Sequence, residues 1–213
     1  NCDRRAAYLQ AATDLLVSDL EYIVAQWADD GAARAVVTTD PQTGLLAMLT
    51  GMGSLSYGEL AGERMKLGLM LNDPEEEQDC FSDNTHNSHY FDGIGIRNVY
   101  TGSYTRMDGT TLTGPSLSEL VAAADPAVDL QLQAELDASV AALMAVKTAA
   151  EGGLAYDQML EAGNVEGEAL IMAAVDALVT QTASIERAVT ALGLSKADFE
   201  GSESLDNPDA IFR

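Results

Sequence analysis

The chain has 213 residues and carries 34 acidic side chains against 11 lysines and arginines, so its formal net charge is −23. A nucleic-acid partner needs a cationic face to neutralise phosphates, so this balance excludes DNA or RNA as a partner and disfavours an anionic membrane surface. The composition is 47% hydrophobic but only 6% aromatic, which favours closely packed helices over a β-sandwich and argues against a charged disordered tail.

The first predicted helix begins near Asp3 and ends near Gly31. Its apolar residues recur at three- and four-residue spacing: Tyr8, Ala12, Leu15, Leu16, Leu20, Ile23, Val24 and Trp27. After a loop, Asp40-Pro41 opens a second helical run to about Asn72, which contains Gly44, Gly51, Gly53, Gly58, Gly62 and Gly68. Each glycine inside a helix costs up to about 1 kcal/mol relative to alanine. The glycines therefore indicate either close approach of a neighbouring helix or a kink that opens a pocket.

An acidic loop follows the second helical run. Asp83-Asn84-Thr85 is typical of an N-cap, and it predicts a short helix to about Tyr100. Residues 101–115 predict a small β-hairpin with a two-residue turn at Asp108-Gly109.

The rest of the chain is predominantly helical. Further helices are predicted over about 116–124, 127–151, 154–161 and 165–192, whereas residues 193–213 show little periodicity. Four or five antiparallel helices with one hairpin make an all-α fold, an up-down helical bundle with a small β-hairpin insert. Since the chain contains neither an internal repeat nor a linker, we predict a single domain over residues 1–213.

The cysteines and the start of the chain bear on its location. Cys2 and Cys80 allow at most one disulfide, and the acidic composition suits a secreted or periplasmic protein, although a cytosolic protein can carry two free thiols. No segment approaches the roughly 18 uninterrupted apolar residues of a membrane span. No signal peptide is present, and the chain opens on Asn1 without a methionine, so we expect a processed product or a fragment.

One segment concentrates reactive side chains. Between Asp73 and Asp92 lie seven carboxylates and both histidines of the chain, and Asp83, His86, His89 and Asp92 recur every three residues. On a helix this spacing stacks neighbouring side chains, and imidazole with carboxylate suits zinc, iron or copper. The alternative is that Asp83 only caps the helix and the histidines are partly exposed polar residues.

A second group lies on the glycine-rich helical run. Glu59 and Glu63 are four residues apart, so an α-helix would place them on one face, next to Arg64. Few polar residues surround them, and an unpaired buried charge is costly. The carboxylates therefore line a cavity or pair internally, or they form an exposed pair or a salt bridge with Arg97 or Arg187.

Three segments resemble the imelysin family, which includes iron-regulated protein A-like and insulin-cleaving metalloproteinase-like proteins of bacteria. They are Glu59-Leu60-Ala61-Gly62-Glu63-Arg64-Met65, Cys80-Phe81-Ser82-Asp83-Asn84-Thr85-His86-Asn87 and Gly95-Ile96-Arg97-Asn98-Val99-Tyr100-Thr101-Gly102. The opening, with Arg4-Arg5, Tyr8-Leu9, Asp19-Leu20 and Trp27, resembles the start of the family's second half.

The resemblance implies a protein of two helical halves that is exported to the periplasm or held at the bacterial outer membrane as a lipoprotein and is linked to iron uptake. The family's Gly-x-His-x-x-Glu motif belongs to the first half and is absent here. This chain is then the second half, with the first half as its partner. By resemblance, Glu59, Glu63, Arg64, Ser82 and Asp83 form its ligand-binding side of a shared cleft, and His86 is the metal-ligand candidate.

Three functions follow as hypotheses. The first is binding of a cation or a metal-bearing ligand in the cleft between the halves, with iron or zinc as candidate metals. The second is a metallopeptidase whose missing histidine and glutamate ligands lie in the first half, with Glu59 or Glu63 as the base. The third is an interaction module without a ligand site.

Overall fold

A computed structural model describes residues 1–212. The residues group into two compact units, Asn1–Ala47 and Met48–Arg213. The prediction of one domain over the whole chain stays a prediction.

The first unit consists of α1 (Cys2–Gln26), α2 (Ala32–Thr39) and the start of α3 (Pro41–Ser54). The predicted first helix is confirmed, but the predicted loop before Asp40 is mostly helical, because α2 occupies it. Asp29 and Arg34 form an ion pair of 3.3 Å across the turn between α1 and α2. No residue of α1, all of which the structure describes, is buried.

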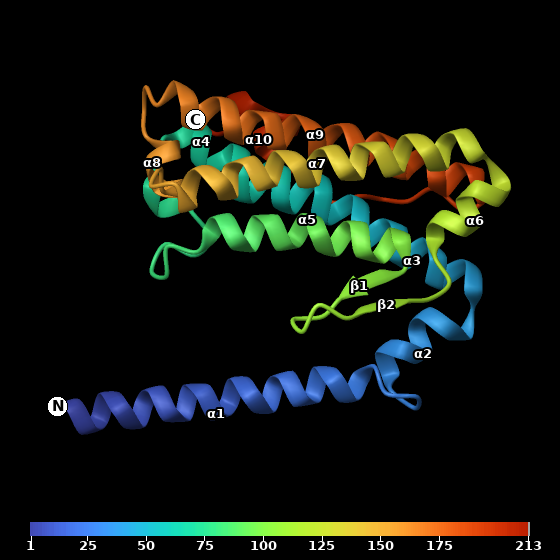
Figure 1. Ribbon diagram of the computed structural model, residues 1–213, viewed down its shortest axis with the longest axis horizontal. Coiled ribbons are helices and arrows are strands. Elements are labelled where there is room, and N and C mark those ends of the chain that lie inside the picture. Colours follow the sequence, from blue (N-terminus) through green and yellow to red (C-terminus); the bar gives the residue numbers. More distant parts are fainter. Residues whose placement is uncertain (213) are drawn as a thin grey trace. The chain divides into compact units, whose positions relative to one another are not determined.

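The second unit is a bundle of four helical rods, which confirms the all-α fold class (Figure 1). The first rod joins the end of α3 to the π-helical segment η1 (Leu55–Lys66) and α4 (Leu67–Leu71). The other three are α5 (Thr85–Thr101), α7 (Pro126–Glu151) and α9 (Val165–Ala191). Contacts run from η1 to α9, from α9 to α7, from α7 to α5 and from α5 back to η1.

Short elements connect the rods. The 3-10 turn η2 (Pro74–Glu76) precedes α5, while α6 (Leu117–Ala124) precedes α7 and α8 (Tyr156–Leu160) lies between α7 and α9. Two of these helices begin at capping residues that can be recognised in the sequence. The Ser116 and Glu119 side chains form a capping box on α6, and the Asp125 carboxylate caps α7. For this reason the predicted bounds of these helices agree closely with the structure.

The predicted hairpin is present as β1 (Ser103–Thr105) paired antiparallel with β2 (Thr111–Thr113). Its loop differs from the prediction. The Arg106 amide donates to the Thr110 carbonyl at 2.8 Å, which leaves three loop residues instead of two. The last of them, Gly109, has φ +82°, the left-handed conformation that a three-residue loop of this kind needs.

The core lies between η1, α7, α8 and α9. It includes the fully buried Leu60, Met65, Leu143, Tyr156 and Leu178. By length and composition alone, α9 could also cross a membrane, but a central helix of a bundle meets the same criterion, and Ile171, Val175, Leu178 and Ile185 of α9 are buried in the protein.

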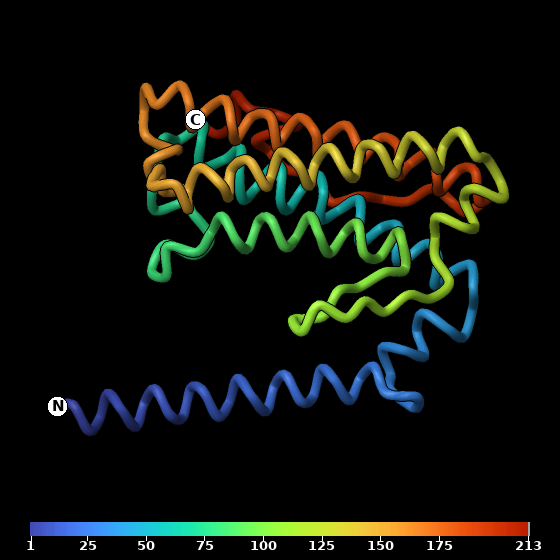
Figure 2. Tube along the Cα trace, in the orientation of Figure 1, coloured from blue at the N-terminus to red at the C-terminus, as the bar shows by residue number. Residues whose placement is uncertain are grey.

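The C-terminal strap, which we define as residues 197–206, lies close to three glycines of the second helical run, Gly53, Gly58 and Gly62. It includes the short helix α10 (Glu203–Asp206) and is followed by η3 (Pro208–Ala210). Figure 2 shows this strap returning along η1. A Cβ on Gly58 would lie 2.5 Å from the Glu200 carbonyl oxygen, and one on Gly62 would lie 2.3 Å from Ser202 Cβ. The prediction that another segment approaches these glycines closely is therefore correct. The segment is the strap, however, and not a neighbouring helix.

Candidate functional site

The two glutamates of η1 have different partners. Glu59 pairs with Arg64, five residues farther along this π-helical segment, at 3.3 Å. Glu63 is exposed and turns to the strap, where the Ser202 hydroxyl donates to its Oε1 at 2.5 Å. The predicted pair with Arg97 or Arg187 does not form in the described residues: Arg97 contacts Asp137 at 3.2 Å.

Arg64 links three elements at this end of the bundle. Besides Glu59, its guanidinium contacts Asp92 of α5 at 3.1 Å and donates to the Gln78 side-chain oxygen at 2.9 Å. Burial raises the pKa of Asp92, and the Arg64 charge opposes this shift. The arginine therefore holds η1, α5 and the acidic loop together.

The other three predicted residues are more dispersed. Ser82 and Asp83 are exposed, and Asp83 has φ +49°, so it is Asn84 that precedes α5 as the N-cap residue. The capping role predicted for Asp83 is wrong, because its backbone is left-handed at that point. His86 is partly buried, and its Nε2 lies 3.1 Å from the Asn87 amide. Asn87 in turn accepts a hydrogen bond of 2.6 Å from Lys147 of α7, so His86 is next to α7.

The second histidine occupies the centre of this region. His89 is fully buried, and its ring meets the ring of fully buried Tyr156 edge-on, with centroids 5.0 Å apart. Within residues 1–212, neither ring nitrogen of His89, nor the Tyr156 hydroxyl, nor Oε2 of Glu77 has a hydrogen-bond partner. We call His89, Tyr156 and Glu77 the unpartnered cluster. A buried polar group without a partner costs roughly 1–3 kcal/mol, so such a group calls for an explanation, such as a water or an ion.

Burial and nearby charges determine the protonation of the cluster. Burial and, second to it, the Arg64 charge lower the pKa of His89 to about 3, so the imidazole is neutral at pH 7. Burial also raises the pKa of the Glu77 carboxyl, and nearby Asp157, Asp83 and Asp79 act in the same direction. The Ser88 hydroxyl donates a short hydrogen bond to Asp79. A neutral imidazole beside carboxylates is suited to hold a cation or a hydrogen-bonding ligand.

The described residues form no complete metal site. Nowhere in residues 1–212 do three or more His, Cys, Asp or Glu side chains gather closely enough to hold a metal ion. Cys2 and Cys80 are both free over the same range. A metal at the unpartnered cluster would therefore need further ligands from outside this chain.

His89 was the weaker histidine candidate on sequence. It is in register with the buried face of α5, formed by Thr85, His89, Gly93, Ile96 and Tyr100. Steps of three and four residues along His89, Gly93, Ile96 and Tyr100 are the signal that could have identified the buried histidine. His86 and His89 are three residues apart, and the residues next to them in the sequence do not show which of the two is the more buried.

A second buried polar cluster, which the sequence analysis missed, lies farther along α5. The Asp129 carboxylate accepts hydrogen bonds from Tyr100 at 2.9 Å, Ser118 at 2.7 Å and Gln133 at 2.7 Å. We call these four residues the Asp129 network. Every one of its polar contacts is internal to the bundle.

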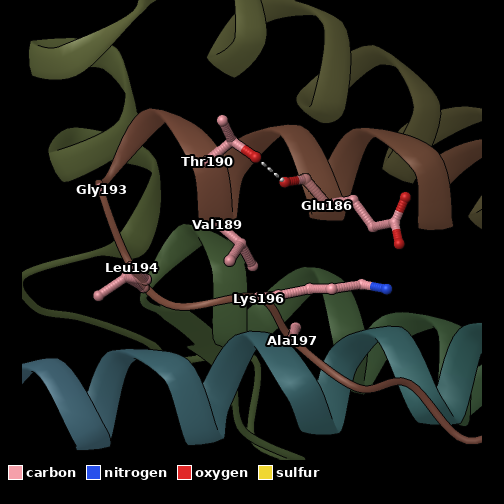
Figure 3. A pocket seen from close by; sticks show the side chains of 7 residues that line it. All are labelled: Glu186, Val189, Thr190, Gly193, Leu194, Lys196 and Ala197. Atoms are coloured by element: carbon pink, nitrogen blue, oxygen red, sulfur yellow. Dashed lines mark hydrogen bonds between the residues drawn. The ribbon is translucent and has the colours of Figure 1, made fainter.

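The hollow in Figure 3 lies elsewhere, between the end of α9 and the segment that leads into the strap. Its volume is about 410 Å³, and its lining includes Glu186, Val189, Leu194 and Lys196. The side chains of Glu186 and Lys196 extend along it in the same direction (Figure 3). None of the six predicted site residues lines this hollow.

Comparison with known proteins gives one family. The model of a peptidase family described as imelysin matches residues 2–185. A search of curated proteins found no significant match. The matched range includes η1, α5 and the unpartnered cluster, whereas the strap follows it.

Proposed function

Because the chain belongs to the imelysin family, we propose that it supplies one side of a ligand site completed by the first half of the same protein. The site binds a cation or a metal-bearing ligand, with iron or zinc as the candidates. The protein acts in iron uptake after export, in the periplasm or attached to the outer membrane of a bacterium.

The unpartnered cluster is the observation that carries this proposal. His89 offers two ring nitrogens, Tyr156 a hydroxyl and Glu77 a carboxylate oxygen, and all four atoms are buried without a partner in the described chain. A ligand that meets these atoms would recover the free energy that their burial costs. The nearby Arg64, Glu59 and Asp92 charges fix the elements around the cluster.

The donor set favours a transition metal over calcium. Neutral imidazole binds zinc and iron well, whereas calcium takes oxygen ligands only. Since this chain gathers too few ligands for a complete site, the first half has to contribute the rest. His86, the histidine singled out by sequence, lies one helical turn away and is available as a neighbour of His89.

Calorimetric titration of the protein containing both halves tests the proposal. We expect saturable heat with Zn²⁺ or Fe²⁺ and little with Ca²⁺. His89→Gln should weaken binding at least tenfold, whereas Thr113→Ala, at an exposed position of the hairpin, serves as the control. The absence of saturable heat for every metal would contradict the proposal and leave the interaction-module hypothesis.

A metallopeptidase is the second candidate, and the family's peptidase name and the exposed Glu63 carboxylate favour it. In that case the histidine and glutamate ligands come from the first half, and Glu59 or Glu63 acts as the base. Hydrolysis of a peptide by the two-half protein should be sensitive to a chelator and be abolished by Glu63→Gln. Metal binding without such hydrolysis would select the binding function.

Export is tested separately by fractionation of the source cells. The proposal expects the full-length protein in the periplasmic or outer-membrane fraction. Recovery with the cytoplasmic fraction would contradict this part of the proposal without bearing on the ligand site.

A further inference from the structure

A second hollow adjoins the one in Figure 3 and shares Glu186, Lys196 and Ala197 with it. We call it the strap hollow, because η1, α9 and the strap form its walls. Its volume is about 450 Å³, within the roughly 300–1,000 Å³ of small-molecule sites. All of its lining residues belong to the second unit, so its walls do not depend on the position of the first unit.

Contacts between the strap and η1 fix the shape of the strap hollow. The Tyr57 hydroxyl donates to the Asp206 carboxylate at 2.7 Å, and the Ser202 amide donates to the other oxygen of Asp206 at 3.0 Å. Burial and the hydrogen bond to Asp206 raise the pKa of Tyr57 to about 12, so its hydroxyl remains a donor at neutral pH. A Cβ on Gly53 would lie 2.5 Å from the Phe199 ring, so the ring lies directly against this glycine. A carboxylate and an aromatic ring are therefore positioned before a ligand binds.

The charged side chains of the strap hollow are mostly acidic. Glu186, Asp198 and Asp206 contribute three carboxylates, and Lys196 is the one basic residue in the lining. Within residues 1–212 neither Glu186 nor Lys196 takes part in an ion pair. Because the carboxylates outnumber the ammonium group, the hollow favours a cation over a neutral or anionic ligand.

The apolar part of the lining favours an organic cation over an inorganic one. Val179, Ala183 and Ala197 contribute aliphatic surface, and Tyr57 and Phe199 contribute two aromatic rings. Aromatic rings attract organic cations, whereas a metal ion gains nothing from aliphatic surface. Over residues 1–212 no three acidic, cysteine or histidine side chains gather closely enough to hold a metal ion, so the three carboxylates of the hollow do not form a metal site.

We propose that the strap hollow binds an organic ammonium ion, a primary amine that carries an apolar group. The carboxylates of Glu186 and Asp206 attract the ammonium group, while Val179, Ala183 and Phe199 cover the apolar group. This inference is independent of the proposed metal-binding site, because no residue of the unpartnered cluster lines the strap hollow.

Nuclear magnetic resonance titration of the 213-residue chain tests the proposal. The probes are 2-phenylethylamine, the neutral 2-phenylethanol and the anionic 3-phenylpropionate, which share a phenyl group and differ in charge. We expect the amine to shift the amide signals of Ala183, Glu186 and Phe199 in a saturable manner, and the other two probes to leave them unchanged. No saturable shift with the amine, or equal shifts with the amine and the alcohol, would overturn the proposal.

Three variants show whether the amine binds in this hollow. Ala183→Trp, at an exposed position of α9, fills the hollow and should abolish saturable binding. Glu186→Gln removes one carboxylate and should weaken binding about two- to fivefold, as for a partly exposed charge pair. Glu168→Gln is the matched control, since this exposed glutamate lies 18 residues earlier on α9, about 27 Å away at roughly 1.5 Å per residue.

The control variant should bind the amine as the parent chain does, and circular dichroism checks that every variant remains helical. Equal weakening by Glu168→Gln and Glu186→Gln would mean that only the overall negative charge attracts the amine, and would overturn the proposal. Unchanged binding in Ala183→Trp would overturn it as well.

Discussion

Two buried polar clusters share helix α5 but differ in how their hydrogen bonds are met. Tyr100, near the end of α5, donates to Asp129, which also accepts from Ser118 and Gln133. His89, near its start, contacts Tyr156, and in the described part of the chain neither ring nitrogen finds a partner. The Asp129 carboxylate is satisfied by partners within the bundle, whereas the described residues give the atoms of the unpartnered cluster no hydrogen-bond partner.

The difference between the two clusters suggests different roles for buried polar groups. A buried network whose members are all satisfied fixes how helices pack. A buried group without a partner destabilises the fold, so its presence marks a candidate for a ligand site. Identical substitutions in the two clusters should therefore have different consequences.

The sharpest comparison uses two fully buried tyrosines. Tyr100→Phe removes the hydroxyl that donates to the Asp129 carboxylate, and we expect it to lower the free energy of unfolding by about 1.5–3 kcal/mol, as for a hydrogen bond to a charged group. Tyr156→Phe removes a hydroxyl without a partner and should be neutral or stabilising. Urea denaturation of both variants measures the difference; equal losses would mean that the Tyr156 hydroxyl does have a partner in this chain.

The strap along η1 gives the next largest effect. In Gly62→Ala the new Cβ would lie 2.3 Å from Ser202 Cβ, so the strap has to move, at a cost of about 1–3 kcal/mol. Gly51→Ala is the control, because a Cβ there meets nothing within 4 Å and alanine favours the helix by up to about 1 kcal/mol. Hydrogen exchange should be faster in residues 197–206 of the Gly62 variant only.

The burial of His89 predicts a pH dependence. Its pKa is about 3 in the folded chain against 6.5 ordinarily, so between these values the unfolded chain binds a proton that the folded chain does not. Stability should therefore fall as the pH falls from 6.5 towards 3, by at most about 1.4 kcal/mol per pH unit from this group. In His89→Gln this contribution should be lost. Urea denaturation between pH 7 and pH 4 gives both slopes, and identical slopes would contradict a buried, neutral His89.

The smallest effect is expected at the surface between the two clusters. Arg97 and Asp137 form an ion pair of 3.2 Å with side chains that are 35% and 69% exposed. Solvent screens such a pair, so Asp137→Asn should change the stability by no more than about 1 kcal/mol. If Asp137→Asn lowered the free energy of unfolding as much as Tyr100→Phe does, the exposed ion pair would contribute as much as a buried hydrogen bond. That result would contradict the distinction between buried and exposed polar contacts.

Much of the fold was predictable because its signals are local. Ser116 with Glu119 and Asp125 with Pro126 begin α6 and α7 near the predicted positions, and the periodicity of α9 gave its length. The helix α2 was missed because eight residues with Val36, Val37, Thr38 and Thr39 give a weak helical signal. The strap was missed because it is held by distant partners, such as Ser54 with Glu200 and Gly62 with Ser204.

The assignment of a ligand site to these residues stays a prediction. The structure shows that Arg64 contacts both Glu59 and Asp92. The sequence did not show that the two glutamates have different partners, since Glu59 pairs with Arg64 whereas Glu63 accepts a hydrogen bond from Ser202 of the strap. The choice of His86 over His89 depended on local motifs, whereas burial is decided by packing against α8, which is more than 60 residues away in sequence.

The most direct test of the central claim uses the ¹⁵N signals of the imidazole rings. In the protein containing both halves, titration with Zn²⁺ should shift both ring nitrogens of His89 in a saturable manner, and Tyr156→Phe should weaken this response. If the His89 signals stay unchanged while the protein remains folded, the unpartnered cluster does not bind a metal, and the central claim is contradicted.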